Sequence, residues 1–315
     1  MTRRPAGIRN GRRSPAGGPE PDEEMLAVED LIVEFGAGTT ATRALRGVDL
    51  SLRAGRVLGV AGESGSGKTT AALATMGLLA RGARASGSIR YRGTELLNLP
   101  ERELRQHRGS QLAMIFQETA SALNPVLKVG DQLMMAARAH TPGGRRDVRR
   151  RVEAALADVR LLDTDRVMNS YPHELSGGMC QRAIIAMALS CGSRVLFADE
   201  PTTALDVSVQ REILDLIRGL VDRHRLAVMM ISHDLAVLSD ICDDLMVMYR
   251  GRVVESGDAR TVLSAPGHPY TQALLDCIPT LHGSGGDLRE ITPEQRVIIE
   301  AAAPVGVAGS GGVAQ

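Results

Sequence analysis

One short segment constrains this chain more than any other part of its sequence. Residues 62–69 read GESGSGKT, which fits the pattern G-x-x-x-x-G-K-[ST] of a phosphate-binding loop. An apolar run over residues 56–62 precedes it and residues 68–80 have helical periodicity, so the loop is predicted to join a buried strand to a helix. Such a loop turns successive backbone N–H groups toward a phosphate at the positive end of the helix. The alternative is a plain glycine turn.

The loop side chains have separate predicted roles. Lys68 is expected to reach the β- and γ-phosphates of a nucleotide, and Thr69 to hold Mg²⁺. Lys68 and Lys128 are the only lysines of the chain, so a lysine stands where a compact ammonium suits a phosphate better than the flat guanidinium of arginine. The residues predicted to bind the nucleotide here are Gly62, Glu63, Ser64, Gly65, Ser66, Gly67, Lys68, Thr69 and Thr70.

Two further apolar strands end in polar residues. The run over residues 195–198 ends at Asp199 and Glu200, and the run over 226–231 is followed by His233. Asp199 is predicted to hold Mg²⁺, and Glu200, on the opposite side of the strand, to act as general base on the attacking water. His233 is predicted to touch the γ-phosphate. The alternatives are solvated loop carboxylates and a structural histidine.

The order of predicted elements indicates an α/β fold. Short alternating segments over residues 25–60 are typical of an antiparallel sheet, whereas apolar strands alternating with helices after residue 56 predict a mainly parallel sheet covered on both faces. Open sheets of this kind bind ligands at the carboxyl ends of their strands. We interpret residues 1–24 as a disordered extension, and residues 283–315 as a low-complexity tail with a short helix near 293–302.

Composition excludes some classes of protein. Lys and Arg total 37, as do Asp and Glu, so net charge gives no argument for nucleic-acid binding. Apart from charge, no run approaches the roughly 20 apolar residues of a membrane span, and the N-terminus lacks the apolar region of a secretory signal. The four cysteines have no metal-ligand or disulfide spacing, which favours buried free thiols in a reducing compartment.

A further motif narrows the family. Residues 175–182 read LSGGMCQR and resemble the LSGGQ signature of ABC ATPases, with Met179 in place of the usual glutamine. A serine and two glycines at a helix start make a second anion site. The resemblance implies that Ser176, Gly177 and Gly178 contact the γ-phosphate of ATP bound to a partner subunit, so that two ATPs lie between two head-to-tail subunits.

Other segments resemble the peptide-importer branch of that family. Gln117 resembles the glutamine that senses Mg²⁺ and faces the membrane subunits; residues 118–125 resemble a DPxxSLNP stretch, and residues 267–271, GHPYT, resemble the HPYT segment after the ATPase core. Phe35 is the candidate for stacking on adenine, with a core position as the alternative. The resemblance covers residues 25–282, with a helical subdomain at about 118–190 and a C-terminal segment at about 258–282.

The resemblance implies fold, function and partners together. The fold would be that of the ABC ATPases: a P-loop NTPase (RecA-like) core, an N-terminal antiparallel β subdomain and an inserted α-helical subdomain. The chain would hydrolyse ATP with Mg²⁺ and energise import of di- or oligopeptides, as a peripheral subunit on the cytoplasmic face of the inner membrane. Its partners would be a second ATPase subunit, identical or paralogous, two transmembrane permease subunits and, indirectly, an extracytoplasmic solute-binding protein, with no nucleic acid.

Three alternatives remain open at this point. The importer could carry nickel or another small solute, because this kind of subunit does not contact the cargo. A soluble ABC ATPase acting on nucleic acid or ribosomes usually has two cassettes or long insertions, and neither is visible here. A degenerate subunit that does not hydrolyse ATP is a third possibility. The presence of Lys68, Asp199, Glu200 and His233 argues against it.

Overall fold

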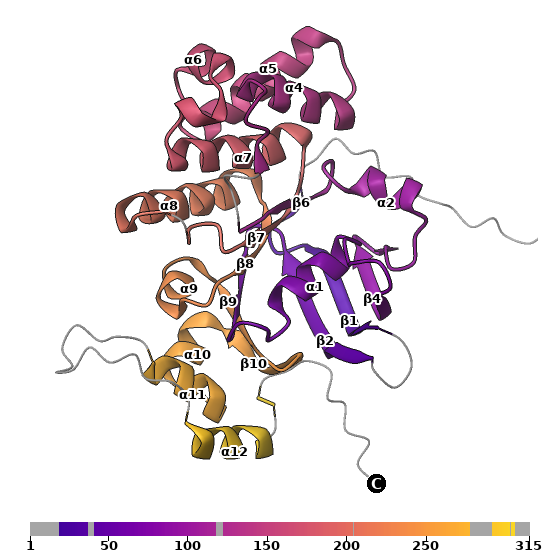
Figure 1. Cartoon of the computed structure of the whole chain (residues 1–315), viewed down its shortest axis with the longest axis vertical. Helices are drawn as coiled ribbons and strands as arrows, with labels where there is room; N and C mark the ends of the chain where they lie inside the picture. Colours follow the sequence, from indigo (N-terminus) through magenta and orange to yellow (C-terminus); the bar gives the residue numbers. More distant parts are fainter. Residues whose placement is uncertain are drawn as a thin grey trace, which may run out of the picture.

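Two sheets of different topology form the body of the protein (Figure 1). The computed structural model describes residues 19–36, 41–117, 122–203, 205–277, 292–302 and 304–305. The first sheet has the order β2-β1-β4-β5 and is antiparallel. Its strands are β1 (Glu24–Phe35), β2 (Thr42–Arg53), β4 (Arg84–Tyr91) and β5 (Thr94–Glu95).

The second sheet has the order β10-β9-β3-β8-β7-β6 and is parallel except for β10, which runs antiparallel to β9. Together with the first sheet it confirms the predicted α/β class with an N-terminal antiparallel part. Its strands are β3 (Val57–Ala61), β6 (Leu112–Ile115), β7 (Val195–Asp199), β8 (Ala227–Ile231), β9 (Asp244–Tyr249) and β10 (Arg252–Asp258).

The helices fall into groups that Figure 1 separates clearly. Four helices, α4 to α7, gather away from the sheets, within or next to the range predicted to be helical. They are α4 (Val129–His140), α5 (Arg145–Asp158), α6 (Thr164–Asn169) and α7 (Gly177–Cys191). The others are α1 (Lys68–Thr75), α2 (Glu101–His107), α8 (Val207–His224), α9 (Leu235–Ile241), α10 (Ala259–Ser264), α11 (Pro269–Asp276) and α12 (Pro293–Ala301).

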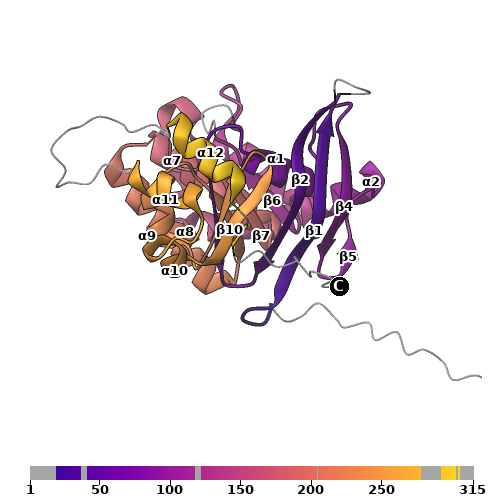
Figure 2. The same ribbon diagram turned by 90° about the horizontal axis from the view of Figure 1, so that it is seen from below.

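Strand β7 shows why the parallel strands read as continuous apolar runs. Val195 and Phe197 pack into the core shared with α1 and the antiparallel sheet, whereas Leu196 and Ala198 pack into the core on the other face. Successive side chains of a strand point to opposite faces, so a strand covered on both sides is apolar at every position. Figure 2 shows the two sheets side by side, with α1 between them.

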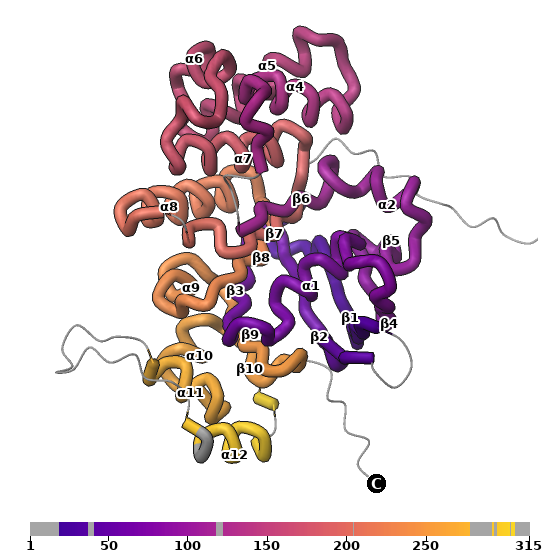
Figure 3. The backbone as a smooth tube through the Cα atoms, viewed as in Figure 1, coloured from indigo at the N-terminus to yellow at the C-terminus, as the bar shows by residue number. Residues whose placement is uncertain are grey.

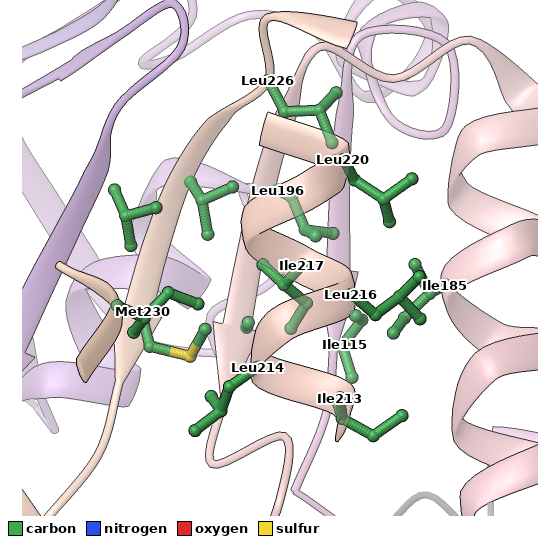
Figure 4. Close-up of a cluster of buried hydrophobic side chains, with 14 of the residues drawn as sticks. Ile115, Ile185, Leu196, Ile213, Leu214, Leu216, Ile217, Leu220, Leu226 and Met230 are labelled. Atoms are coloured by element: carbon green, nitrogen blue, oxygen red, sulfur yellow. The ribbon is translucent and has the colours of Figure 1, made fainter. Parts of the chain in front are cut away.

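Helix α8 covers the second face of the parallel sheet. Its buried residues recur at helical spacing and meet side chains of β7, β8 and α7, as the close-up in Figure 4 shows. The labelled side chains are Ile115, Ile185, Leu196, Ile213, Leu214, Leu216, Ile217, Leu220, Leu226 and Met230. This packing fixes the strand that ends at Asp199, and with it the position of the predicted acidic pair.

The ends of the described chain are tied to the body. Asp22 donates its N–H to the carbonyl of Ala54 at 3.0 Å, and Ala54 donates to the carbonyl of Glu23 at 2.9 Å. Residues 1–18 of the predicted extension and most of the predicted tail lie outside the described residues, but helix α12 lies where a short helix was expected. In the part of the chain that the structure describes, every helix is too short or too polar to cross a bilayer.

Candidate nucleotide-binding site

The glycine-rich loop connects β3 to α1, as the sequence predicts. Three of its glycines, Gly62, Gly65 and Gly67, have φ values of 147°, 78° and 106°, which L-residues with side chains rarely adopt. Space is limiting as well: a Cβ on Gly62 would lie 2.3 Å from the carbonyl oxygen of Met248. Glycine at position 62 therefore lets the loop pass against the end of β9.

The loop and the ends of three strands, β6, β7 and β8, line one cavity of about 250 Å³. Here the residues predicted from four separate parts of the sequence come together, with Ala44 of β2 as an additional wall. The lining residues are Ala44, Ser64, Gly65, Gly67, Lys68, Thr69, Thr70, Gln117, Asp199, Glu200 and His233. Gly62, Glu63 and Ser66 belong to the loop but do not line the cavity.

Lys68 and Asp199 are charged groups removed from water. Their exposed fractions are 6% and 5%. Burial lowers the pKa of Lys68, although the charges of Glu200 and Asp199 oppose this shift. Burial likewise raises the pKa of Asp199, against a hydrogen bond from Thr69. The ammonium of Lys68 donates to the carbonyl oxygens of Gly62 at 2.7 Å and Glu63 at 2.9 Å.

These contacts fit a phosphate ligand with its cation. The carbonyl oxygens of the loop are weak partners for a buried ammonium, so anionic oxygens in the cavity would satisfy Lys68 better. A hydroxyl beside a buried carboxylate, as in Thr69 and Asp199, is the oxygen donor set that Mg²⁺ takes in nucleotide sites. The buried hydroxyl of Ser66 in the loop also finds no hydrogen-bond partner among the described residues.

Glu200 is held by three side chains. His233 Nδ1 lies 2.8 Å from Oε1, while Gln117 Nε2 and Thr203 Oγ1 each donate to Oε2 at 2.9 Å. Burial raises the pKa of Glu200, but the hydrogen bonds from His233 and Thr203 outweigh it and lower the pKa overall. The backbone of Glu200 has φ 47°, a conformation that costs about 1 kcal/mol or more and is typical of functional positions.

Thr203 is a partner of Glu200 that the sequence does not predict. A threonine three residues beyond the acid in a turn is a weak signal, because its hydroxyl could equally face water. The structure shows that this turn brings it back onto the carboxylate. Gln117 and His233 were predicted to act at the phosphate and metal; the structure shows that both contact Glu200.

The serine-glycine motif lies in another place. Ser176 is the N-cap of α7, where its hydroxyl accepts from the Met179 N–H at 3.3 Å. Ser176 and Gly178 line a separate cavity of about 390 Å³ that shares no residue with the phosphate cavity. A Cβ on Gly178 would lie 2.7 Å from a methyl of Val209, so glycine lets α7 approach α8 here. Within one chain the two predicted anion sites are distinct.

Phe35 is not brought to the phosphate cavity. It ends β1, half-buried and packed against the core between the sheets, and lines a shallow cavity with Arg81 and Arg84. Residues 37–40, which follow it, lie outside the described residues. Stacking on adenine stays a prediction for Phe35, beside the alternative of a core role.

Comparison with known proteins places these features in a family. A family model described as "ABC transporter" matches residues 45–203, and one described as "Oligopeptide/dipeptide transporter, C-terminal region" matches residues 254–306. The chain is 45% identical over 273 residues to the oligopeptide transport ATP-binding protein OppD of Salmonella typhimurium, covering 87% of this chain and 82% of that one. It is 42% identical to the dipeptide transport ATP-binding protein DppD of Escherichia coli, over 81% and 78% of the two chains.

Solved structures agree with the fold. A dimeric post-hydrolysis state of the ATP-binding cassette MJ0796, bound to ADP and Pi, superposes with a TM-score of 0.65 at 25% identity, covering 75% of this chain and 99% of that one. CbiO1 of Clostridium perfringens, part of the transporter complex cbiONQ, gives 0.67 at 26% identity, over 78% and 92%. The chain thus belongs to the ATP-hydrolysing, ATP-binding subunits of ABC transporters, in the oligopeptide/dipeptide transporter family.

Proposed function

We propose that this subunit binds Mg²⁺-ATP in the phosphate cavity and that the energy of its hydrolysis drives the import of oligopeptides or dipeptides. One observation carries the proposal: Lys68 of the glycine loop, the adjacent acids Asp199 and Glu200, and His233, from three separate segments, line a single cavity. The peptide cargo rests on the relatives, whose names specify oligopeptide and dipeptide transport. Nickel or another small solute is the alternative cargo, and the acids and histidine of the cavity argue against a degenerate subunit.

Each group in the cavity has a distinct task. Lys68 binds the β- and γ-phosphate oxygens in place of the carbonyls that it contacts here. Thr69, Asp199 and Gln117 are the side chains that would hold Mg²⁺, and the cation would supply charge neutralisation for the phosphates. Ser64 to Thr70 supply donors for the remaining phosphate oxygens.

Glu200 accepts a proton from the attacking water. Its lowered pKa keeps the carboxylate ionised at neutral pH, and three hydrogen bonds hold it in one orientation. His233, with 60% of its side chain exposed, has an open side from which it can contact the γ-phosphate. Gln117 connects this carboxylate to the loop after β6, so movement of the loop would displace the base.

Hydrolysis requires a second subunit in this proposal. Ser176 and Gly178 line a cavity apart from that of Lys68, so one chain alone does not bring both predicted anion sites to one nucleotide. A head-to-tail pair of subunits would place the N-terminus of α7 of each over the phosphates of the other. The dimeric form of the similar cassette MJ0796 supports the pairing of two subunits.

Substituting Ser176 with aspartate tests the shared site. Aspartate is as good an N-cap as serine, so α7 keeps its start, but the new carboxylate would oppose the partner's γ-phosphate. We expect ATP hydrolysis to fall by about 30-fold while ATP affinity of the separate subunit changes less than about two-fold. Ser176→Asn, a neutral cap of the same shape, is the matched control. Equal hydrolysis by the aspartate variant and wild type would contradict the shared site.

The membrane subunits are proposed from the family and from exposed apolar side chains. Phe116, the neighbour of Gln117 in the chain, and Val126 and Met135 of the helical part are exposed by 46%, 75% and 64%, which suits a contact with another protein. We expect two permease subunits and a second ATPase subunit to co-purify from native membranes, with the chain peripheral on the cytoplasmic side. Mass spectrometry of the purified complex identifies them. Recovery with ribosomes or nucleic acid and without permeases would favour the soluble ABC class.

A further inference from the structure

The C-terminal part of the chain forms hydrogen bonds with the phosphate loop. Glu63, the second residue of the loop, donates its N–H to the hydroxyl of Tyr270 in α11 at 2.8 Å. Its carboxylate accepts from both terminal nitrogens of Arg296 in α12, at 3.2 and 3.4 Å. Its carbonyl accepts from Lys68 at 2.9 Å. The N–H, the carbonyl and the carboxylate of Glu63 thus all have hydrogen-bond partners. The partners that lie outside the loop belong to α11 and α12.

Tyr270 is itself rigidly placed. It is fully buried, and its ring packs against that of Tyr249 at 4.6 Å between centroids. The start of its helix is capped by side chains. His268 is the N-cap, and its Nδ1 accepts from the N–H of Tyr270. The buried carboxylate of Glu255 accepts from the N–H groups of Gly267 and His268. These contacts give the GHPY sequence a physical role, which is to hold one phenol against the phosphate loop.

Helix α12 is anchored independently of Arg296. Val305, beyond its end, donates to the carbonyl of Val254 at 2.8 Å and accepts from Ser256 at 3.0 Å, and Glu300 pairs with Arg250. Figure 3 shows α11 and α12 beside the β9–β10 hairpin, whose turn also reaches the loop, since Gly251 donates to the carbonyl of Ser66 at 2.9 Å. Arg296 therefore approaches Glu63 from a fixed support.

We infer that Tyr270 and Arg296 are positioning residues for ATP binding: they hold Glu63, and through it the phosphate loop and Lys68, in the conformation that accepts the triphosphate. The inference rests on the proposed function. Neither residue lines the phosphate cavity, so neither is a ligand of the nucleotide. Their effect comes from preorganisation, because a loop that is already ordered loses less conformational entropy when ATP binds.

The first test removes the phenol alone. In the full-length chain, Tyr270→Phe keeps the ring and its packing on Tyr249 but leaves the Glu63 N–H without its partner. We expect the KM for ATP, and the Kd of a fluorescent ATP analogue, to rise about five-fold, with kcat within a factor of two. A fall in kcat at unchanged KM would overturn the inference, and so would wild-type values for both.

The second test uses the ion pair. Arg296→Ala should raise the KM on the order of two-fold, since a half-exposed pair contributes little, and Arg296→Lys should restore most of the loss. Glu300→Gln is the matched control: it removes the ion pair between Glu300 of α12 and Arg250 without touching the loop, and should leave the KM unchanged. A KM rise in Glu300→Gln equal to that of Arg296→Ala would reduce the effect to general docking of α12 and overturn a specific role for Arg296.

The proposed function is tested separately in the same assays. Lys68→Ala must lose ATP binding if the cavity binds the triphosphate. Wild-type ATP binding, a loss in Lys68→Ala and no change in Tyr270→Phe or Arg296→Ala would refute the positioning role alone. No ATP binding by the wild-type chain would instead remove the proposed site.

Discussion

Replacing Glu200 with glutamine is expected to lower ATP turnover on the order of 10³-fold while ATP still binds. Glutamine keeps the shape of the side chain and can still accept from Gln117 and Thr203, but it cannot take a proton from water. The backbone at position 200, with φ 47°, is as accessible to glutamine as to glutamate. Binding of the phosphates by Lys68 and the loop is left intact, so ATP should accumulate in the closed dimer.

Phosphate release measures the turnover of the Glu200→Gln variant, and size-exclusion chromatography with ATP or ADP measures its dimer. We expect a stable dimer with ATP and monomers with ADP. Glu153→Gln is the matched control, because Glu153 is a partly exposed acid of α5 paired with Arg149 and lies outside the cavity. Loss of ATP binding in Glu200→Gln, or turnover equal to wild type, would contradict the role of Glu200 as general base.

Lys68→Ala should weaken ATP binding by about 100-fold. The ammonium is the only lysine charge that the structure places in the cavity, and hydrogen bonds from a charged group to phosphate are each worth about 1.5–3 kcal/mol. Its burial strengthens the effect, since little water competes for the ammonium. Isothermal titration of the variant with ATP and with ADP measures the loss.

Lys128→Ala is the control for Lys68→Ala. Lys128 is the other lysine of the chain, and its ammonium lies 3.3 Å from Asn169 Oδ1 on the surface of the helical part. The control should bind ATP as wild type does. Thermal unfolding of the two variants distinguishes a lost ligand from a lost fold, and ATP affinity equal to wild type in a folded Lys68→Ala chain would refute the phosphate-loop role.

The sequence specified the local parts of the site. The glycine loop between a strand and a helix is contiguous, so its pattern predicts both its shape and its ligand, and the apolar runs that end at Asp199 and before His233 predict strand ends. Because parallel strands present their carboxyl ends at one edge, these residues were expected to meet. The structure confirms the parallel sheet and shows that they line one cavity.

Only the tertiary structure decided which partners complete the site. Tyr270 and Arg296 are 207 and 233 residues from Glu63, and no local pattern links residues so far apart. The resemblance implied that Ser176 acts on a partner's nucleotide, but only the structure shows it in a cavity apart from Lys68, and only the structure shows Phe35 packed against the core. A loop or a strand end depends on residues that are neighbours in the sequence, so its pattern can be recognised there. Contacts between distant segments depend on how the sheets and helices pack, and this packing is determined by all the buried side chains together.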